Sequence, residues 1–304
     1  MEIVKDNGFI ALLDIHMGKK CGIRLDNIDE AIVDKLNQVL QMCLEKNYRT
    51  VLTAGDIFDG VNIQRPAFLN VWKAFNKFRR LGITVYVLWG NHDMYRGNPE
   101  LKNETPLQIL IETEVVKEYP EDYLRITDGK ESIDVKAFDY YDEITPYTGD
   151  LENSMLIAHT FYENEFMGGK DHNLTASDID KLGYKTVVLG HDHSYYPPVT
   201  TKGNNTVFRF GSLTRVSTTP GELQRRIRVM DFYLDGSYHM EELEVKKLED
   251  IAKAETQKLE VKSIDYSSIV KEIQSSNVEN EDNVLVLINK VENEDIKKII
   301  LENI

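Results

Sequence analysis

The stretch Ile83-Thr84-Val85-Tyr86-Val87-Leu88-Trp89-Gly90-Asn91-His92-Asp93 joins an apolar run to a group of polar side chains. Residues 83–88 are typical of a buried β-strand, and Gly90 allows the backbone to turn sharply where that strand ends. Asn, His and Asp after a glycine are also common turn residues, so this group alone is weak evidence for a site. Its meaning depends on whether other strands end in the same way.

Four further apolar segments end in side chains of the same kind. Residues 9–13 lead into Asp14 and His16, residues 50–54 into Asp56 and Asp59, residues 154–158 into His159, and residues 186–189 into His191 and His193. Helical patterns over 28–43 and 66–82 separate the first strands, which predicts parallel β-α-β units. Because functional residues of such sheets gather at the carboxyl ends of the strands, we expect these groups to meet at one edge.

The expected cluster combines carboxylate, amide and imidazole groups. This mixture suits Mn²⁺, Fe²⁺ or Zn²⁺ better than Ca²⁺, and a carboxylate that bridges two ions is typical of two-metal sites acting on phosphates. Taken singly, each group has a structural interpretation: Asp14-x-His16 is often incidental, residues 55–59 resemble a turn, and a histidine such as His159 is more often structural. All five groups in order, each after an apolar strand, favour a metal centre.

The composition narrows the class of protein. The 304 residues, 41% of them hydrophobic, suffice for one large domain with a small appendix. The apolar runs are too short to cross a membrane, the N-terminus lacks the pattern of a signal peptide, and Cys21 and Cys43 lack metal-binding spacing. We therefore expect a cytoplasmic protein. The net charge of −15 is unusual for a nucleic-acid enzyme, although carboxylates around bound cations would account for part of it.

The C-terminal region differs in composition from the rest. Residues 246–260 are charged and poor in apolar side chains, which is typical of a linker. Residues 261–304 predict a short helix, a strand and a second helix, which together would form a small α/β cap. The expected organisation is therefore a catalytic domain over residues 1–245, a linker over 246–260 and a capping domain over 261–304.

Together the motifs resemble the calcineurin-like metallophosphoesterase superfamily. The matching residues are Asp14-x-His16, Gly55-Asp56-x-x-Asp59, Gly90-Asn91-His92-Asp93, His159 and Gly190-His191-x-His193. Within this superfamily the chain is similar to the SbcD nucleases, on residues 55–59, the His191 motif and Phe210-Gly211-Ser212-Leu213. These nucleases are bacterial relatives of the "meiotic recombination eleven" repair nuclease, and phages carry similar subunits. The resemblance covers about residues 8–245. It implies an α/β fold in which helices flank two mixed β-sheets in a layered sandwich, followed by the small cap.

The resemblance also implies a role for each motif residue. One metal ion would be held by Asp14, His16, Asp56 and His193, and the other by Asp56, Asn91, His159 and His191. Asp56 would bridge the two divalent ions, with Mn²⁺ preferred to Fe²⁺, Mg²⁺ or Zn²⁺. His92 would face the leaving oxygen as a catalytic residue, and Asp59 matches a position that orients this histidine in many relatives.

The implied activity is Mn²⁺-dependent cleavage of DNA phosphodiesters, as a 3′–5′ exonuclease and endonuclease in repair and recombination. The implied partners are a second copy of the chain and an SMC-like ATPase of the SbcC type. The short region after residue 246 indicates that the ATPase-binding segment is reduced or truncated. Candidate DNA contacts are Lys19, Lys20, Arg65, Arg96, Arg209 and Arg215, although a solvated surface position is the simpler interpretation of each.

Two alternatives stay open. A phosphatase, or a phosphodiesterase of small molecules such as cyclic nucleotides, would use the same fold. Protein phosphatases of this superfamily usually carry Asp-Arg-Gly after the Gly-Asp-x-x motif, whereas Gly60-Val61 follows Asp59 here. A metal-free scaffold is the other alternative, and the intact residue sets at all five strand ends disfavour it. Metal analysis with a generic diester substrate would separate the scaffold from the enzymes, and digestion of DNA would separate the two enzymes.

Overall fold

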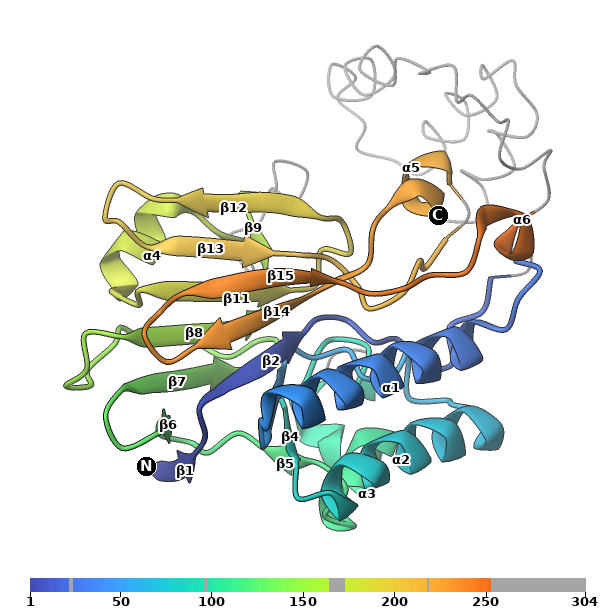
Figure 1. The fold of residues 1–304 in the computed structure, drawn as a ribbon, viewed down its shortest axis with the longest axis horizontal. Coiled ribbons are helices and arrows are strands. Elements are labelled where there is room, and N and C mark those ends of the chain that lie inside the picture. Colours follow the sequence, from blue (N-terminus) through green and yellow to red (C-terminus); the bar gives the residue numbers. More distant parts are fainter. Residues whose placement is uncertain (22–23, 96–97, 164–172, 218, 253–304) are drawn as a thin grey trace, which may run out of the picture. The chain divides into compact units, whose positions relative to one another are not determined.

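The computed structural model describes residues 1–21, 24–95, 98–163, 173–217 and 219–252. Two large β-sheets pack face to face, and helices cover the outer faces of this sandwich (Figure 1). The first sheet contains, in spatial order, β1 (Glu2–Lys5), β6 (Leu124–Thr127), β7 (Ser132–Phe138), β8 (Ser154–His159), β11 (Thr186–Gly190), β13 (Thr206–Arg209) and β12 (Tyr196–Thr200). The second contains β15 (Tyr238–Glu242), β14 (Arg228–Tyr233), β2 (Gly8–Leu12), β3 (Thr50–Thr53), β4 (Thr84–Val87) and β5 (Lys117–Glu118).

Both sheets are mixed. Strands β2, β3, β4 and β5 run parallel, whereas β14 and β15 extend that sheet in the antiparallel sense. In the first sheet β7, β8, β11 and β13 run parallel to one another, and β12 is antiparallel to β13. The pair β9 (Phe161–Tyr162) and β10 (Asn173–Leu174) forms a separate small sheet. The predicted α/β class with two mixed sheets is confirmed.

The helices begin and end at residues suited to those positions. In α1 (Ile28–Lys46), the Asn27 side chain accepts hydrogen bonds from two backbone N–H groups, and the helix ends at Asn47 in the left-handed conformation. In α2 (Arg65–Arg80), a proline occupies the first turn. The shorter helices are η2 (Pro99–Glu104, a 3₁₀ helix), α3 (Pro106–Glu112), α4 (Ala176–Leu182), α5 (Pro220–Gln224) and α6 (Leu248–Ile251). No described helix is long and apolar enough to span a membrane.

Three apolar layers hold the sandwich together. One lies between the second sheet and α1 and α2, where Leu36, Val71 and Phe75 are fully buried. A second lies between the two sheets and includes the stacked rings of Phe9 and Phe232. A third packs α4 against the first sheet. Because both faces of the central parallel strands are covered, the polar side chains that a substrate can reach gather at the strand ends.

The described chain ends in a segment that returns to the N-terminal half. Ile251 is buried, its carbonyl accepts a hydrogen bond from the Leu25 N–H, and Ala252 forms an isolated bridge with Arg24. The chain divides into two units, Met1–Lys258 and Leu259–Ile304, and the second lies outside the described residues. The predicted boundaries at 245 and 260, and the cap over 261–304, stay predictions.

Candidate metal centre

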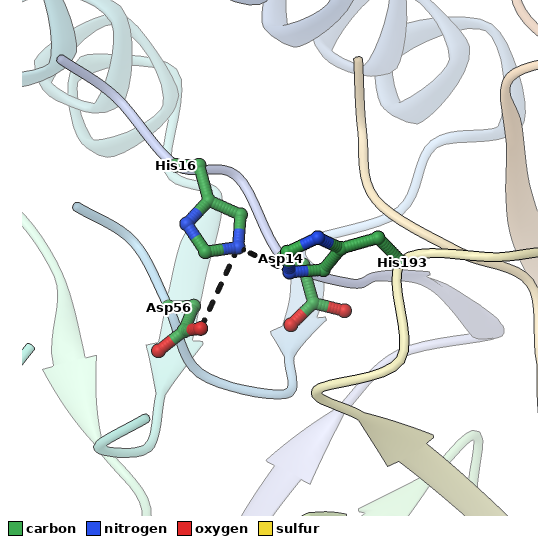
Figure 2. A group of neighbouring side chains, drawn as sticks. All are labelled: Asp14, His16, Asp56 and His193. Atoms are coloured by element: carbon green, nitrogen blue, oxygen red, sulfur yellow. Dashed lines mark hydrogen bonds and ion pairs between the residues drawn. The ribbon is translucent and has the colours of Figure 1, made fainter. Parts of the chain in front are cut away.

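The polar side chains that follow five strands of the two sheets meet at one place. Figure 2 shows Asp14 and His16, which follow β2, converging with Asp56, which follows β3, and with His193, which follows β11. Their backbones take unusual conformations to do so, since Asp14, His16 and Asp56 all have φ between 39° and 51°. Non-glycine residues rarely adopt positive φ, and such positions concentrate at functional sites.

The first group consists of these four residues, whose potential ligand atoms lie within 4.8 Å of one another. The Nε2 atoms of His16 and His193 are 2.7 Å apart, and His16 Nε2 lies 3.5 Å from Asp56 Oδ2. Ring nitrogens that face each other at this distance share at most one proton, so at least one lone pair points into the group. Converging lone pairs and carboxylate oxygens are what a divalent cation needs.

The second group combines Asp56 with His159 and His191. His159 Nε2 lies 3.3 Å from Asp56 Oδ2, 2.9 Å from Asn91 Oδ1 and 3.1 Å from His191 Nδ1. Asp56 belongs to both groups, as expected of a bridging carboxylate. The structure therefore brings together all seven residues that we predict from the sequence to be metal ligands.

Hydrogen bonds from the backbone hold these ligands in place. Asp14 Oδ1 accepts from the His191 N–H at 2.9 Å, and Asp56 Oδ1 accepts from the His92 N–H at 3.0 Å. The Ala54 carbonyl, 2.7 Å from His159 Nδ1, can only accept, so Nδ1 carries a proton, and Nε2 is the nitrogen that would offer its lone pair to a metal ion once deprotonated. In each of these three side chains, one polar atom is held by the backbone and the other faces the cluster of potential metal ligands.

Gly90 permits the closest of these approaches. A Cβ atom at this position would lie 2.0 Å from Asp56 Oδ1 and 2.4 Å from the Asp56 backbone nitrogen. No side chain can be accommodated at such distances without moving the Asp56 loop. The glycine in the Gly90-Asn91-His92-Asp93 motif is therefore required by packing against Asp56. The turn does not demand it, because Gly90 is not among the residues with positive φ.

The charges of the cluster are poorly balanced by the chain itself. Asp14, His16 and Asp56 are fully buried, and among the described residues Asp14 Oδ2 and Asp56 Oδ2 have no hydrogen-bond partner. Burial raises the pKa of Asp14 to about 6, and the nearby Asp56 carboxylate adds to this effect. Leaving such oxygens buried is costly unless a cation binds them. The residues present therefore fit a pair of divalent metal ions.

Burial and the neighbouring charges also shift the pKa values of the histidines. Burial alone would lower the pKa of His159, but the adjacent Asp56 carboxylate outweighs it and raises the pKa to about 9. Burial and the neighbouring His16 lower the pKa of His193 to about 3. For Asp56, burial acts to raise the pKa, but His159 and His16 hold it below its ordinary value. Opposite shifts within one cluster are typical of functional sites.

His92 lies at the rim of the cluster, with about a third of its side chain exposed. Its Nδ1 is 3.1 Å from the Asp59 backbone carbonyl, which fixes the proton on Nδ1. The Asp59 carboxylate is farther away, with Oδ1 3.9 Å from His92 Nδ1 but 2.9 Å from Lys19 Nζ and 3.3 Å from His16 Nδ1. Asp59 thus orients His92 through its main chain, while its carboxylate contacts His16 and Lys19.

The candidate DNA contacts occupy varied positions. Lys20 and Arg65 are exposed, Lys19 pairs with Asp59, and Arg209 stacks between the rings of Tyr162 and Tyr196. Arg96 lies outside the described residues. The Arg215 side chain is buried and donates to the Arg225 carbonyl at 3.1 Å, which differs from the surface position that a DNA contact needs.

Sequence patterns gave no role to Asp93, which the structure places beneath the site. This buried carboxylate accepts hydrogen bonds from the backbone N–H groups of Ile57, Phe58 and Gly90, at 3.0–3.1 Å. It therefore ties the loop that carries Asp56 to the loop that carries Asn91 and His92. The only sequence feature that could have indicated this role for Asp93 is its position directly after His92 in the motif.

A family model described as Calcineurin-like phosphoesterase matches residues 12–195. The chain belongs to this family, and the prediction that it is a metal-dependent hydrolase is confirmed. The family uses a dimetal site, and the chain has candidate ligands for one. The match spans every strand end described above, from β2 to His193 after β11.

Curated proteins with similar sequences include two that are named for DNA repair. The chain is 28% identical over 202 residues to "DNA double-strand break repair protein Mre11" of Methanocaldococcus jannaschii, covering 61% of this chain and 51% of that protein. It is 25% identical to "Uncharacterized metallophosphoesterase YhaO" of Bacillus subtilis, covering 63% and 50%, and 22% identical to Mre11 of Sulfolobus acidocaldarius, covering 60% and 48%. The chain thus spans about half the length of the curated relatives it matches, and the predicted resemblance to this group of nucleases is confirmed.

Two solved structures are similar to the chain at low sequence identity. A dimetal phosphatase from Danio rerio gives a TM-score of 0.49 at 13% identity, covering 77% of this chain and 95% of that one. The protein TT1561 of Thermus thermophilus gives 0.46 at 8% identity, covering 78% and 99%.

Proposed function

We propose that the chain is a Mn²⁺-dependent nuclease that hydrolyses DNA phosphodiesters in repair or recombination. The observation that carries the proposal is the buried cluster around Asp56, with His92 at its rim. In this cluster Asp14 Oδ2 and Asp56 Oδ2 have no hydrogen-bond partner among the described residues. The two similar proteins named for DNA double-strand break repair support DNA as the substrate. An SMC-like ATPase and a second copy of the chain are the partners we propose with it.

Seven side chains would hold two metal ions. Asp14, His16 and His193 would complete one site, and Asn91, His159 and His191 the other, with Asp56 shared between them. When bound, two divalent cations lower the pKa of water and stabilise charge on phosphate oxygens. The buried loops, tied together by Asp93, would keep the ligands fixed while substrate binds at the exposed rim.

His92 is placed to act on the leaving group. Its Nδ1–H is held by the Asp59 carbonyl, so a protonated ring would present its second N–H, on Nε2, to a substrate at the rim. Cleavage of a phosphodiester builds negative charge on the departing sugar oxygen, and a proton donated there would relieve it. General acid catalysis of this kind typically contributes about 10²–10⁴-fold.

A second candidate is a phosphodiesterase of small molecules. A cavity of about 540 Å³ opens beside His92 and Asn91, which is large enough for a small diester such as a cyclic nucleotide. A separate cavity of about 630 Å³ adjoins His193 and is lined by Arg226 and Arg228. Two cavities that adjoin different residues of the cluster offer room for a substrate longer than a small diester, which favours a nucleic-acid strand.

Digestion experiments separate the candidates. The purified chain would be incubated with Mn²⁺ and, in separate reactions, linear duplex DNA, single-stranded DNA, a cyclic nucleotide and bis(p-nitrophenyl) phosphate. We expect DNA to be cleaved, and the matched variant Asp56→Asn to be inactive on every substrate. Cleavage of the small diesters without any cleavage of DNA would support the second candidate instead. No activity on any substrate, with no bound metal by elemental analysis, would contradict both.

A further inference from the structure

The cavity beside His92 differs in chemistry from the metal cluster that it adjoins. Its wall includes the rings of Tyr95, Tyr140 and Tyr141, together with Met94 and Asn62. Among the described residues that line it, none carries a formal charge at neutral pH apart from His92 when protonated. An uncharged aromatic wall next to a phosphate-cleaving centre suits a flat, neutral group better than a second phosphate.

Two of these tyrosines, Tyr140 and Tyr141, are held at the cavity by a turn anchored to the end of β4. Asp139 begins this turn, and its Oδ1 accepts a hydrogen bond from the Trp89 N–H at 2.8 Å. The Tyr140 N–H donates to the Trp89 carbonyl, also at 2.8 Å. The rings of Tyr140 and Tyr141 then lie 4.3 Å apart with an angle of 63° between their planes. The aromatic wall is therefore fixed to the strand whose end carries Asn91 and His92.

Two of the tyrosines expose their rings to solvent at the mouth of the cavity. Tyr141 is 50% exposed and Tyr95 is 45% exposed. Tyr141 also has a φ of 81°, a conformation that residues with bulky side chains rarely adopt. Strain of this kind persists where the surrounding structure imposes it, and it is concentrated in ligand-binding regions.

We propose that this cavity holds the nucleobase of the nucleotide on the leaving-group side of the cut phosphate, stacked against Tyr141 and Tyr95. The inference rests on the proposed nuclease function and on His92 as the proton donor. Because the leaving oxygen must lie within hydrogen-bond reach of His92, its nucleoside extends into the cavity that His92 lines. Stacking accepts every base, since each has a π-face, so the contact selects nucleotides without selecting sequence.

Tyr140 has a different role from the two exposed rings. Its ring centroid lies 5.3 Å from that of His191 and 5.9 Å from that of His159. Substitution of Tyr140 would therefore disturb the proposed ligands as well as the cavity. Tyr141 contacts the ring of Tyr140 and lines the cavity from an exposed position, which makes Tyr141 the position that tests stacking with the least disturbance of the ligands.

The test uses single-stranded oligonucleotides in which phosphorothioates block every linkage but one. An abasic tetrahydrofuran residue replaces the nucleotide on the 5′ side of the open linkage, on its 3′ side, or on neither side. Mass spectrometry of the products identifies the broken P–O bond and hence the leaving nucleoside. For the native chain with Mn²⁺, we expect loss of the leaving-side base to lower kcat/KM about tenfold, chiefly through KM. Loss of the other base should have a smaller effect.

Variants assign this dependence to the cavity. Tyr141→Leu should cleave the intact oligonucleotide about tenfold less efficiently and show no further loss with the leaving-side abasic residue. Tyr141→Phe keeps the ring and should behave like the native chain. Tyr238→Leu removes a similarly exposed tyrosine outside the cavity and serves as the matched control. Unchanged melting temperatures in Mn²⁺ would show that the variants fold and bind metal.

The outcomes distinguish this inference from the function it rests on. If the native chain cleaves intact and leaving-side abasic oligonucleotides equally well, the base-binding site is wrong while the nuclease stands. If Tyr141→Leu keeps the native preference for a base, the base lies elsewhere and the inference is again overturned. If bis(p-nitrophenyl) phosphate is hydrolysed but no oligonucleotide is cut, the nuclease function fails and this inference fails with it.

Discussion

Buried carboxylates occur in two regions of the molecule, and the chain neutralises them in different ways. Asp134 on β7 is fully buried, and Arg125 on β6 binds it through two hydrogen bonds of 2.7 and 2.9 Å while the Tyr147 hydroxyl donates a third. Asp14 and Asp56 are equally buried, but each keeps an oxygen without a hydrogen-bond partner among the described residues.

The difference separates a structural carboxylate from a functional one. A buried charge is tolerated when the fold supplies its counter-charge, as Arg125 does for Asp134. In the metal centre, the ion pairs that the structure describes for Asp14 and Asp56 are with histidines. Imidazoles that are themselves metal ligands give up their protons when a cation binds. The cluster therefore depends on a cation from outside the chain, and the following predictions test that contrast.

The largest expected effect is on activity and comes from His92→Gln. Glutamine keeps a polar side chain at the rim but cannot donate a proton as an acid, so turnover of DNA should fall about 10²–10⁴-fold. Metal content and DNA affinity should stay near those of the native chain, because the His92 ring hydrogen-bonds the Asp59 carbonyl and is not one of the seven proposed ligands, although it lies 5.0 Å from the ring of His16. Elemental analysis, a binding titration and single-turnover rates measure the three quantities. Loss of metal would instead make His92 a ligand, and a native rate would remove it from the mechanism.

A change in the structural region should act on stability instead. Arg125→Leu leaves the buried Asp134 carboxylate without its cation, so the free energy of unfolding should fall by about 3–5 kcal/mol. Urea unfolding with and without Mn²⁺ measures this loss, which should be the same in both conditions.

Lys181→Leu is the control for that measurement. It removes the exposed pair with Asp178, in which the Lys181 side chain is 74% exposed, and should cost less than about 1 kcal/mol. Equal losses for Arg125→Leu and Lys181→Leu would show that burial of Asp134 is not what makes its ion pair important.

The same contrast explains what the sequence could predict. The seven ligand candidates follow apolar strands directly, so a local pattern located them. The partners of Asp59 could not be predicted in this way, because Lys19 and His16 reach its carboxylate through packing of the loops after β2 and β3. Its carbonyl contact with His92 is also a product of this packing.

Two other features depend on contacts between distant parts of the chain. Arg215 has the sequence context of a surface cation, yet it is buried against the carbonyl of Arg225. The aromatic wall formed by Tyr140 and Tyr141 depends on how the turn after β7 packs against Trp89 at the end of β4. A sequence pattern shows which residues end a strand, but not which strand end lies beside another.

Metal itself should stabilise the fold through the functional cluster only. Mn²⁺ that binds the native state and not the unfolded state should add about 2.7 kcal/mol when its free concentration is about 100 times Kd. Thermal melts in Mn²⁺ and in chelator should therefore differ for the native chain and for Arg125→Leu alike. Asp56→Asn removes the shared ligand, and its melting temperature should no longer respond to Mn²⁺. A full response in that variant would place the stabilising ions somewhere else.

A small effect on stability should have opposite signs in the two regions. Asp14→Asn in chelator keeps the oxygen that accepts from the His191 N–H and removes a buried charge close to Asp56. Removing this buried charge and its repulsion by Asp56 should raise the free energy of unfolding by about 1 kcal/mol. The response to Mn²⁺ should be lost. Asp134→Asn makes the identical chemical change but weakens both hydrogen bonds with Arg125, so it should destabilise the chain with or without Mn²⁺. Urea unfolding of both variants in chelator measures the two signs. If Asp14→Asn destabilises the metal-free chain as Asp134→Asn does, Asp14 is neutralised by the fold after all, and the distinction between the two regions fails.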